Sequence, residues 1–249
     1  WSNDDFPELG GDTTLEQCLK ETNEIGFSGI EAGGKFPKNS RELIPKLKKE
    51  NLKLCSGWYG ANLLKNTVKE EILIMKNQLN LFKECDAPCM VVAEVSGSIQ
   101  GQAKIPLSKR PILNNDEWKI FYDKINEISK YMEDSGVPLA YHHHMGTVVQ
   151  SQEDTERLID NTLDTVKLLI DTGHMMFAGG DFEKIAKDYS TRLYHVHCKD
   201  IRKDILDIAL KDDLSFIEAF FSGAFTVPGD GCINYKNFLK VLKDLDYKG

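Results

Sequence analysis

Six short apolar runs alternate with helix-like segments along most of the chain, and this alternation constrains the fold more than any other feature. The runs are predicted strands at residues 28–31, 52–56, 89–93, 137–141, 166–170 and 193–197. Predicted helices precede, separate or follow them at residues 13–26, 39–51, 67–86, 116–135, 152–163, 181–189, 213–222 and 234–246. Strands that alternate with helices form right-handed β-α-β crossovers, so the chain is expected to build a parallel sheet.

Every predicted strand ends at or just before a polar or ionisable residue: Glu31, Ser56, Glu94, His142, Asp171 and His197. A closed barrel carries chemistry at the carboxyl ends of many strands, whereas an open sheet concentrates it at one switch point. No glycine-rich dinucleotide or phosphate loop follows any of these strands. The sequence therefore predicts an α/β protein with the (β/α)8 TIM barrel fold.

The spacing of the strands agrees with a barrel but accounts for six of its eight strands. Strand ends recur about every 33 residues between Glu31 and His197, so eight units need roughly 265 residues. Residues 1–3 would then follow a first strand, and residues 247–249 would precede an eighth. We expect residues 1–249 to form a single TIM barrel domain that lacks most of its first and last strands.

Composition argues against several classes of partner. The chain has 31 basic and 39 acidic residues and a net charge of −8, which is unfavourable for binding nucleic acid through its phosphates. No window approaches the ~18 consecutive apolar residues that a membrane helix needs. Six scattered cysteines fit reduced thiols in a cytoplasmic protein better than a disulfide framework. Assembly into a homo-oligomer is left open.

Histidines locate the expected site, because all six lie within residues 142–197. Side chains alternate between the two faces of a strand, so His142 and His144 share one face and His143 points to the other. His195 and His197 share a face in the same way. For His143 and His195 we expect ordinary positions in the core.

A divalent metal site is predicted where neighbouring strands bring His142, Asp171 and His197 to one rim. Imidazole and carboxylate ligands without thiolate suit Mn²⁺, Co²⁺, Zn²⁺ or Fe²⁺. The alternative for Asp171 is that it caps the loop at Thr172 and Gly173.

Other polar and aromatic residues near strand ends are candidates for contact with a polar substrate. Three cations follow strands, namely Lys35, Lys199 and Arg202, and each is otherwise a solvated surface charge. Trp58 and Phe36 are suited to the floor of a sugar-like ring or to core packing. Glu94 is equally suited to function or to bonding neighbouring backbone amides.

Several stretches of the sequence carry a resemblance to a known family. The inosose dehydratases of inositol catabolism, a group within the xylose isomerase-like TIM barrel superfamily, resemble the chain over almost its whole length. Asp171-Thr-Gly-His174 and the His-x-Lys-Asp pattern at residues 197–200 are common to that superfamily, which includes sugar epimerases and apurinic endonucleases. More specific to the dehydratases are Tyr141-His-His-His-Met-Gly-Thr147 and the stretch that begins at Glu94; residues 1–12, 29–37, 56–59 and 227–231 also match.

The resemblance implies a metal-dependent enzyme that removes water from 2-keto-myo-inositol, a small polyol ketone, to give a trihydroxycyclohexane-1,2-dione. It implies Mn²⁺ or Co²⁺ held by His142 (where many relatives have Glu), Asp171 and His197. Zn²⁺ and Fe²⁺ are alternatives, and glutathione is left open as a further cofactor. The fourth ligand of the superfamily, a Glu on the last strand, lies beyond the given chain.

Dehydration of such a ketone requires a base for the proton beside the carbonyl and an acid for the leaving hydroxyl. We expect Glu94 as the base and His144 or His174 as the acid, with the reverse assignment also open. Lys35, Trp58, Lys199 and Arg202 would contact the substrate. An isomerase or epimerase and a non-catalytic polyol-binding barrel are the alternative functions; the acidic balance disfavours a nuclease.

Overall fold

A six-stranded parallel sheet forms the centre of the computed structural model, which describes residues 9–248. Its strands are β1 (Gly29–Ala32), β2 (Lys53–Ala61), β3 (Met90–Glu94), β4 (Leu139–His142), β5 (Val166–Asp171) and β6 (Leu193–His197). They lie side by side in chain order. A doubly wound sheet reverses its strand order at a switch point, and a barrel does not. The predicted α/β barrel architecture is therefore confirmed.

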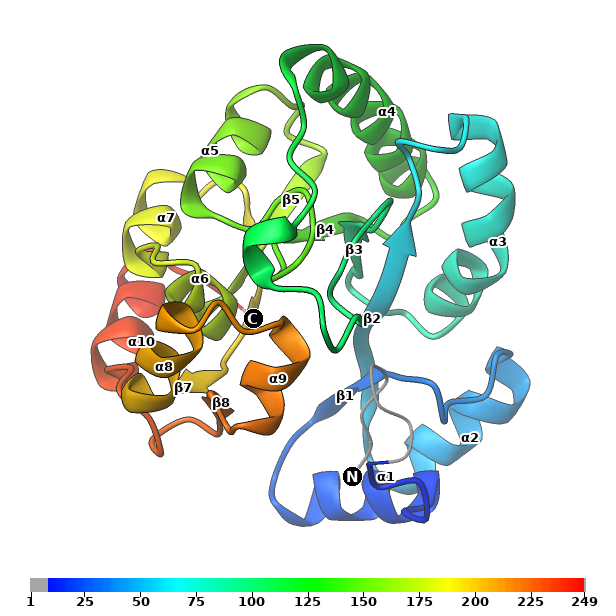
Figure 1. Ribbon diagram of the computed structural model, residues 1–249. Helices are drawn as coiled ribbons and strands as arrows, with labels where there is room; N and C mark the ends of the chain where they lie inside the picture. Colours follow the sequence, from blue (N-terminus) through cyan, green and yellow to red (C-terminus); the bar gives the residue numbers. More distant parts are fainter. Residues whose placement is uncertain (1–8, 249) are drawn as a thin grey trace.

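Helices cover the outer face of the curled sheet (Figure 1). They are α1 (Leu15–Glu24), α2 (Ser40–Lys49), α3 (Val68–Glu84), α4 (Asn115–Asp134), α5 (Gln152–Asp160), α7 (Phe182–Asp188) and α10 (Tyr235–Asp244). Each of these helices begins where a Ser, Thr, Asn or Asp side chain accepts a hydrogen bond from a backbone N–H of the first turn. Such capping residues are the feature of the sequence that marks a helix start. Among residues 9–248, no helix is both long and apolar enough to cross a membrane.

The alternation of side chains along the strands divides the core into two layers. Outward-facing residues such as Val92 and Tyr141 pack in a large cluster with apolar residues of the helices. Inward-facing residues form a small cluster of Cys89, Val91, Ala140 and Leu169, which Trp58 contacts. Two positions beyond Ala140 and Leu169, the inward-facing residues are His142 and Asp171. The polar site thus lies directly above the inner apolar layer.

The region after β6 differs from the prediction. The helix expected at residues 213–222 is present as α9 (Phe216–Phe221), which starts three residues later than predicted, and α8 (Lys203–Lys211), which precedes it, was not predicted. Asp213 has φ of 47°, a left-handed conformation that ends a helix. Ser215 then caps α9 by a reciprocal pair of hydrogen bonds with Glu218.

Four smaller elements were also not predicted. They are α6 (Thr172–Phe177), the 3₁₀ turn η1 (Leu107–Lys109) and the two-residue strands β7 (Asp200–Ile201) and β8 (Phe225–Thr226), which pair antiparallel. β2 also continues to Ala61, five residues beyond its predicted end, so Trp58 lies on a strand. The expectation that residues 1–3 follow a further strand falls outside the described residues.

Candidate active site

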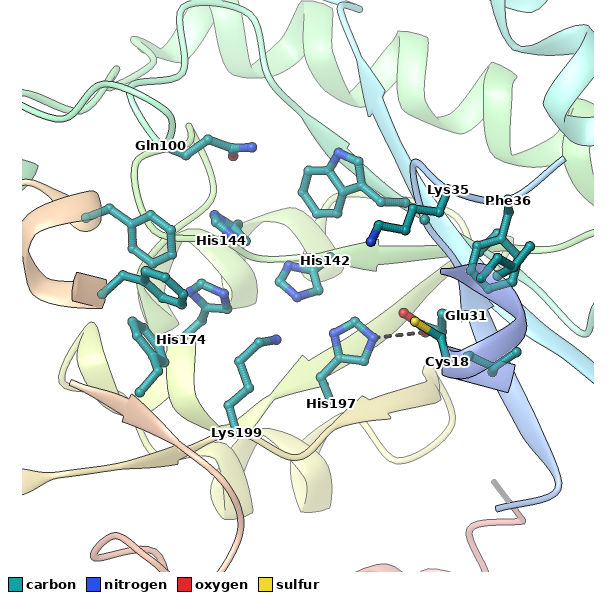
Figure 2. Close-up of a pocket in the computed structure, with 18 residues that line it drawn as sticks. Cys18, Glu31, Lys35, Phe36, Gln100, His142, His144, His174, His197 and Lys199 are labelled. Atoms are coloured by element: carbon teal, nitrogen blue, oxygen red, sulfur yellow. Dashed lines mark hydrogen bonds and ion pairs between the residues drawn. The ribbon is translucent and has the colours of Figure 1, made fainter. Parts of the chain in front are cut away.

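A cavity of about 520 Å³ opens at the carboxyl ends of the strands. Histidines from β4, β6 and α6 and the loop after β4 line it, namely His142, His144, His174 and His197. Figure 2 shows Gln100 above these imidazoles, Lys199 below His142 and beside His197, and Lys35 on the side of the view away from His174. Polar groups from distant parts of the sequence therefore converge on one space, as expected for the functional face of a barrel.

Asp171 is the centre of this arrangement and is fully buried. Its Oδ1 accepts a hydrogen bond of 3.0 Å from the backbone N–H of His174 and so begins α6. Its Oδ2 lies 3.3 Å from His142 Nε2 and 3.5 Å from His197 Nδ1, and it accepts a hydrogen bond from the Lys199 ammonium. The residue therefore caps a turn, as one interpretation proposed. It is not itself among the described residues that line the cavity, but its Oδ2 contacts three that are, namely His142, His197 and Lys199.

Burial and charge set the protonation states around Asp171. Burial opposes its ionisation, but the ammonium of Lys199 and the neighbouring histidines hold its pKa well below the usual range. Burial keeps the pKa of His142 well below 6.5, against the effect of the carboxylate. For His197, burial lowers the pKa, but Asp171 and Glu31 together raise it above its ordinary value. At neutral pH the centre holds an anionic carboxylate and a neutral His142.

These residues suit a divalent cation. One ligand atom from each of His142, Asp171 and His197 lies within 4.8 Å of the other two. The Nδ1 atom of His197 is buried and makes no hydrogen bond to any residue in the range 9–248. Two imidazole nitrogens and one carboxylate oxygen form a ligand set that accepts Zn²⁺, Mn²⁺, Co²⁺ or Fe²⁺.

Glu31, at the end of β1, was noted in the sequence only as a polar strand end. Its Oε1 lies 2.7 Å from His195 Nε2 and 3.0 Å from His197 Nε2, and so links the first and last strands of the sheet. Burial opposes the ionisation of Glu31, but the two histidines lower its pKa. His195, expected in the core, is partly exposed. His143 is fully buried and its Nε2 accepts from the Asp171 N–H, as the core assignment predicted.

His144 and His174 form a pair whose ring centroids are 3.9 Å apart. The peptide groups of Met145 hold them in opposite tautomers. His144 Nδ1 lies 2.8 Å from the Met145 carbonyl and must donate to it, which leaves Nε2 with a lone pair. The Met145 N–H donates to His174 Nδ1 at 3.4 Å, so the proton of His174 is on Nε2.

Burial keeps both imidazoles of this pair neutral near pH 7. It lowers the pKa of His144 to about 4 and that of His174 well below 6.5. One ring therefore offers a proton acceptor and its neighbour a proton donor. General acid–base chemistry needs this combination.

The structure brings three of the four predicted substrate-binding residues to the cavity, namely Lys35, Trp58 and Lys199. The Lys35 ammonium donates to the carbonyls of Gly10 and Thr13, which fixes its position. The Trp58 ring lies edge-on to His142 and His144, with centroids 5.5 Å apart in each case. Phe36 also lines the cavity.

Glu94 and Arg202 are not among the described residues that line the cavity. Glu94 is 1% exposed, and its two oxygens accept hydrogen bonds from the backbone N–H groups of Leu63 (2.6 Å) and Ser96 (2.7 Å). Burial raises its pKa even though these bonds oppose the rise. Glu94 therefore fixes two loops, which is the alternative role that the sequence allowed.

The Arg202 side chain is directed to the segment around β8. Its guanidinium donates to the carbonyl of Gly223 at 2.8 Å, to Thr226 Oγ1 at 2.9 Å and to Asp230 Oδ2 at 2.5 Å. These bonds tie the start of α8 to β8 and to the residues on both sides of it.

Sequence reasoning missed one amide and an aromatic wall of the cavity. Gln100 lies in the stretch that begins at Glu94, which indicated only a resemblance to the dehydratases. Phe216, Phe220 and Phe225 line the cavity, and the rings of Phe216 and Phe225 contact that of His174. Phe216 and Phe220 belong to α9, whose start was misplaced. An apolar periodicity that predicts a helix does not indicate whether the helix covers a site or only the core.

Comparison with known proteins agrees with the fold. A family model for the xylose isomerase-like TIM barrel matches residues 19–249. The solved structure of the probable 3-DHS dehydratase AsbF from Bacillus anthracis superposes with a TM-score of 0.71 at 15% identity, over 94% of this chain and 85% of that one. The IOLI protein, with a bound zinc atom, gives 0.65 at 17% identity, over 95% and 82%. At these identities the likeness is one of fold.

Curated relatives are similar over the full length of the chain. The rhizopine catabolism protein MocC of Rhizobium meliloti is 42% identical over 249 residues, which cover all of this chain and 77% of the relative. Inosose dehydratase 2 of Bacillus cereus is 40% identical over 251 residues, which cover all of this chain and 84% of the relative. The chain therefore belongs to the xylose isomerase-like TIM barrel family and, within it, to the group that contains the inosose dehydratases and MocC.

Proposed function

We propose that the chain is a metal-dependent hydro-lyase that removes water from 2-keto-myo-inositol to give a trihydroxycyclohexane-1,2-dione. Relatives at about 40% identity that carry the name inosose dehydratase support this reaction. The observation that carries it is the His144–His174 pair, a proton acceptor beside a proton donor, next to Asp171. Elimination of water needs both functions within the length of one substrate.

His142, Asp171 and His197 would hold the metal ion, for which we propose Mn²⁺ or Co²⁺. A bound divalent cation supplies Lewis acidity that favours negative charge on a ketone or hydroxyl oxygen. The ionised Asp171 and the neutral His142 are in the protonation states that such a site requires, whereas His197, whose pKa is raised, would release a proton when the ion binds. Lys199 donates to the same carboxylate oxygen, so this position already favours positive charge.

Proton transfer is assigned to the paired imidazoles, because Glu94 uses its oxygens within the fold. The Nε2 lone pair of His144 takes a proton from the carbon beside the ketone, and the electron pair of that C–H bond forms a carbon–carbon double bond. The hydroxyl on the next carbon leaves with the electron pair of its C–O bond and takes the Nε2 proton of His174, which forms water. These transfers leave His144 as an imidazolium and His174 as an imidazolate, and a proton that passes from His144 to His174 through solvent restores both neutral tautomers.

The remaining cavity residues would orient the ring. Lys35 and Lys199 enter from different sides (Figure 2). The Lys199 ammonium would donate to an oxygen of the polyol, whereas Lys35, whose ammonium donates to the carbonyls of Gly10, Gly11 and Thr13, would contribute its positive charge. Trp58 and the phenylalanines of α9 provide apolar surface for the carbon face of a six-membered ring.

The proposal is tested with chelator-stripped protein and 2-keto-myo-inositol. Product is followed by mass spectrometry with and without Mn²⁺ or Co²⁺. Metal-dependent loss of one water supports the dehydratase. A metal-dependent change of isomer at constant mass would replace it with an epimerase, and no reaction with any divalent metal would contradict an enzymatic role for this chain.

A further inference from the structure

Gln100 lies on the segment between β3 and η1 and lines the cavity. Figure 2 shows its carboxamide extending from above toward the space over the imidazoles. The Oε1 atom is buried and accepts no hydrogen bond from any residue in the range 9–248. A buried acceptor without a donor is unfavourable, and a donor from a ligand removes that cost.

Backbone contacts with the loop after β4 fix the position of Gln100. The Ile99 N–H donates to the Gly146 carbonyl at 2.9 Å, and Ser98 Oγ donates to the same oxygen at 3.2 Å. Gly146 has φ of +81°, and a Cβ there would lie 2.8 Å from the Gln100 nitrogen. The two loops therefore touch closely, and the loop that holds His144 also supports Gln100.

The direction of the carboxamide differs from that of the groups assigned to the reaction. In Figure 2, His144 and His174 form one wall, Lys199 rises from below, and Gln100 enters from above. A polyol ring in contact with the imidazoles leaves hydroxyls directed away from the reacting carbons. The Gln100 oxygen is the buried acceptor on that side, and a hydroxyl is the donor that a polyol offers.

We propose that Gln100 is a specificity-determining residue whose Oε1 accepts a hydrogen bond from a ring hydroxyl that does not react. This inference rests on the proposed function for its substrate class. A site that leaves a buried acceptor unpaired rejects the analogue without the matching hydroxyl. Gln100 therefore selects a fully hydroxylated ring over one of its deoxy forms.

The test compares Gln100→Leu with Gln102→Leu as a matched control. Leucine keeps most of the side-chain volume and removes the carboxamide. Gln102 is two residues away on the same loop and is exposed, and its Nε2 donates to the Ser98 carbonyl. Steady-state kinetics are measured on 2-keto-myo-inositol and on a panel of its monodeoxy analogues, and calorimetry measures the binding of myo-inositol to the same proteins.

For Q100L we expect KM to rise about tenfold with kcat within about threefold of wild type, because the lost bond is made equally in ground and transition states. One monodeoxy analogue, discriminated against by the wild type, should become nearly as good a substrate as the parent ketone. Binding of myo-inositol should weaken by a similar factor. Q102L should match the wild type in every measurement.

Failure of this inference can be distinguished from failure of the proposed function. A wild type that dehydrates the ketone, with a Q100L variant of unchanged KM and unchanged discrimination, overturns the role of Gln100 alone. A wild type that binds myo-inositol without turnover overturns the reaction, and weaker binding by Q100L then still supports the role of Gln100. Equal binding by both proteins, or binding by neither, overturns that role.

Discussion

Asp171 and Glu94 end two strands of the same sheet, and both are almost completely buried. Their partners differ. One oxygen of Asp171 accepts from the His174 N–H, but ionisable side chains surround the other, namely His142, His197 and Lys199, all of which line the cavity. Backbone N–H groups of Leu63 and Ser96 satisfy Glu94.

The kind of hydrogen-bond partner indicates the role of a buried carboxylate. Backbone donors cannot leave without unfolding a loop, so a carboxylate that they satisfy belongs to the scaffold. Side-chain donors can move or be replaced by a ligand. Asp200 is a second case of the scaffold type, because it accepts from the N–H groups of Gly229, Gly231 and Ile233. Position at a strand end is therefore weaker evidence of chemistry than the kind of partner.

The largest expected effect is that of Asp171→Asn. The variant loses the negative charge that Lys199 and the metal ion would share, so we expect loss of bound metal and a fall in kcat/KM of about 10³-fold or more. An Asn side chain still caps α6 through its oxygen, so the fold should persist. Metal analysis by mass spectrometry and steady-state kinetics test this. A D171N protein that binds a full complement of metal and keeps activity within tenfold of wild type would mean that Asp171, like Glu94, has a structural role.

Alanine variants of the paired imidazoles come next. His144→Ala and His174→Ala should each reduce kcat by roughly 10²–10⁴-fold, the usual contribution of general acid–base catalysis. Their roles separate in D₂O. H174A should still exchange the proton beside the ketone with solvent, because His144 remains, whereas H144A should lose exchange and dehydration together. Exchange that survives in H144A and disappears in H174A would reverse the assignment of base and acid.

Substitution of Glu94 tests the other half of the comparison. In Glu94→Gln, the NH₂ group meets one of the two backbone N–H donors, which is left without an acceptor. The free energy of unfolding should fall by about 1–3 kcal/mol, while activity stays within about tenfold of wild type. Urea unfolding and kinetics on the same samples measure both. A loss of activity as large as that of D171N, without loss of stability, would return Glu94 to the role of base.

Local patterns explain which parts of the fold and site the sequence could predict. Helix starts depend on caps within one turn, and strands depend on short apolar runs, so both were found close to their observed bounds. The grouping of His142, Asp171 and His197 at one rim could be predicted because parallel strands align their carboxyl ends. In the structure, Asp171 of β5 pairs directly with His197 of β6. The helix α8 was missed because Arg202 precedes it and makes no capping hydrogen bond, so its start carries no local signal.

Contacts between distant segments explain the rest. Glu94 bonds to Leu63, which lies 31 residues away, and Arg202 bonds to Gly223, 21 residues away. The opposite tautomers of His144 and His174 depend on the orientation of the Met145 peptide groups. None of these is a property of spacing along the chain. Sequence reasoning therefore identified residues capable of chemistry without showing which of them face the cavity.

The smallest expected effect concerns Arg202, the second cation after β6. Lys199 and Arg202 are three residues apart, but Lys199 lines the cavity and Arg202 bonds the segment around β8. Arg202→Met should change kcat/KM by less than about threefold, since its ion pair with Asp230 is exposed to solvent and contributes little. Lys199→Met, the matched variant, should reduce kcat/KM by about 10²-fold because it removes a charge from the cavity. Equal losses of kcat/KM in the two variants would mean that both cations contribute to catalysis. The kind of hydrogen-bond partner would then not distinguish active-site residues from structural ones.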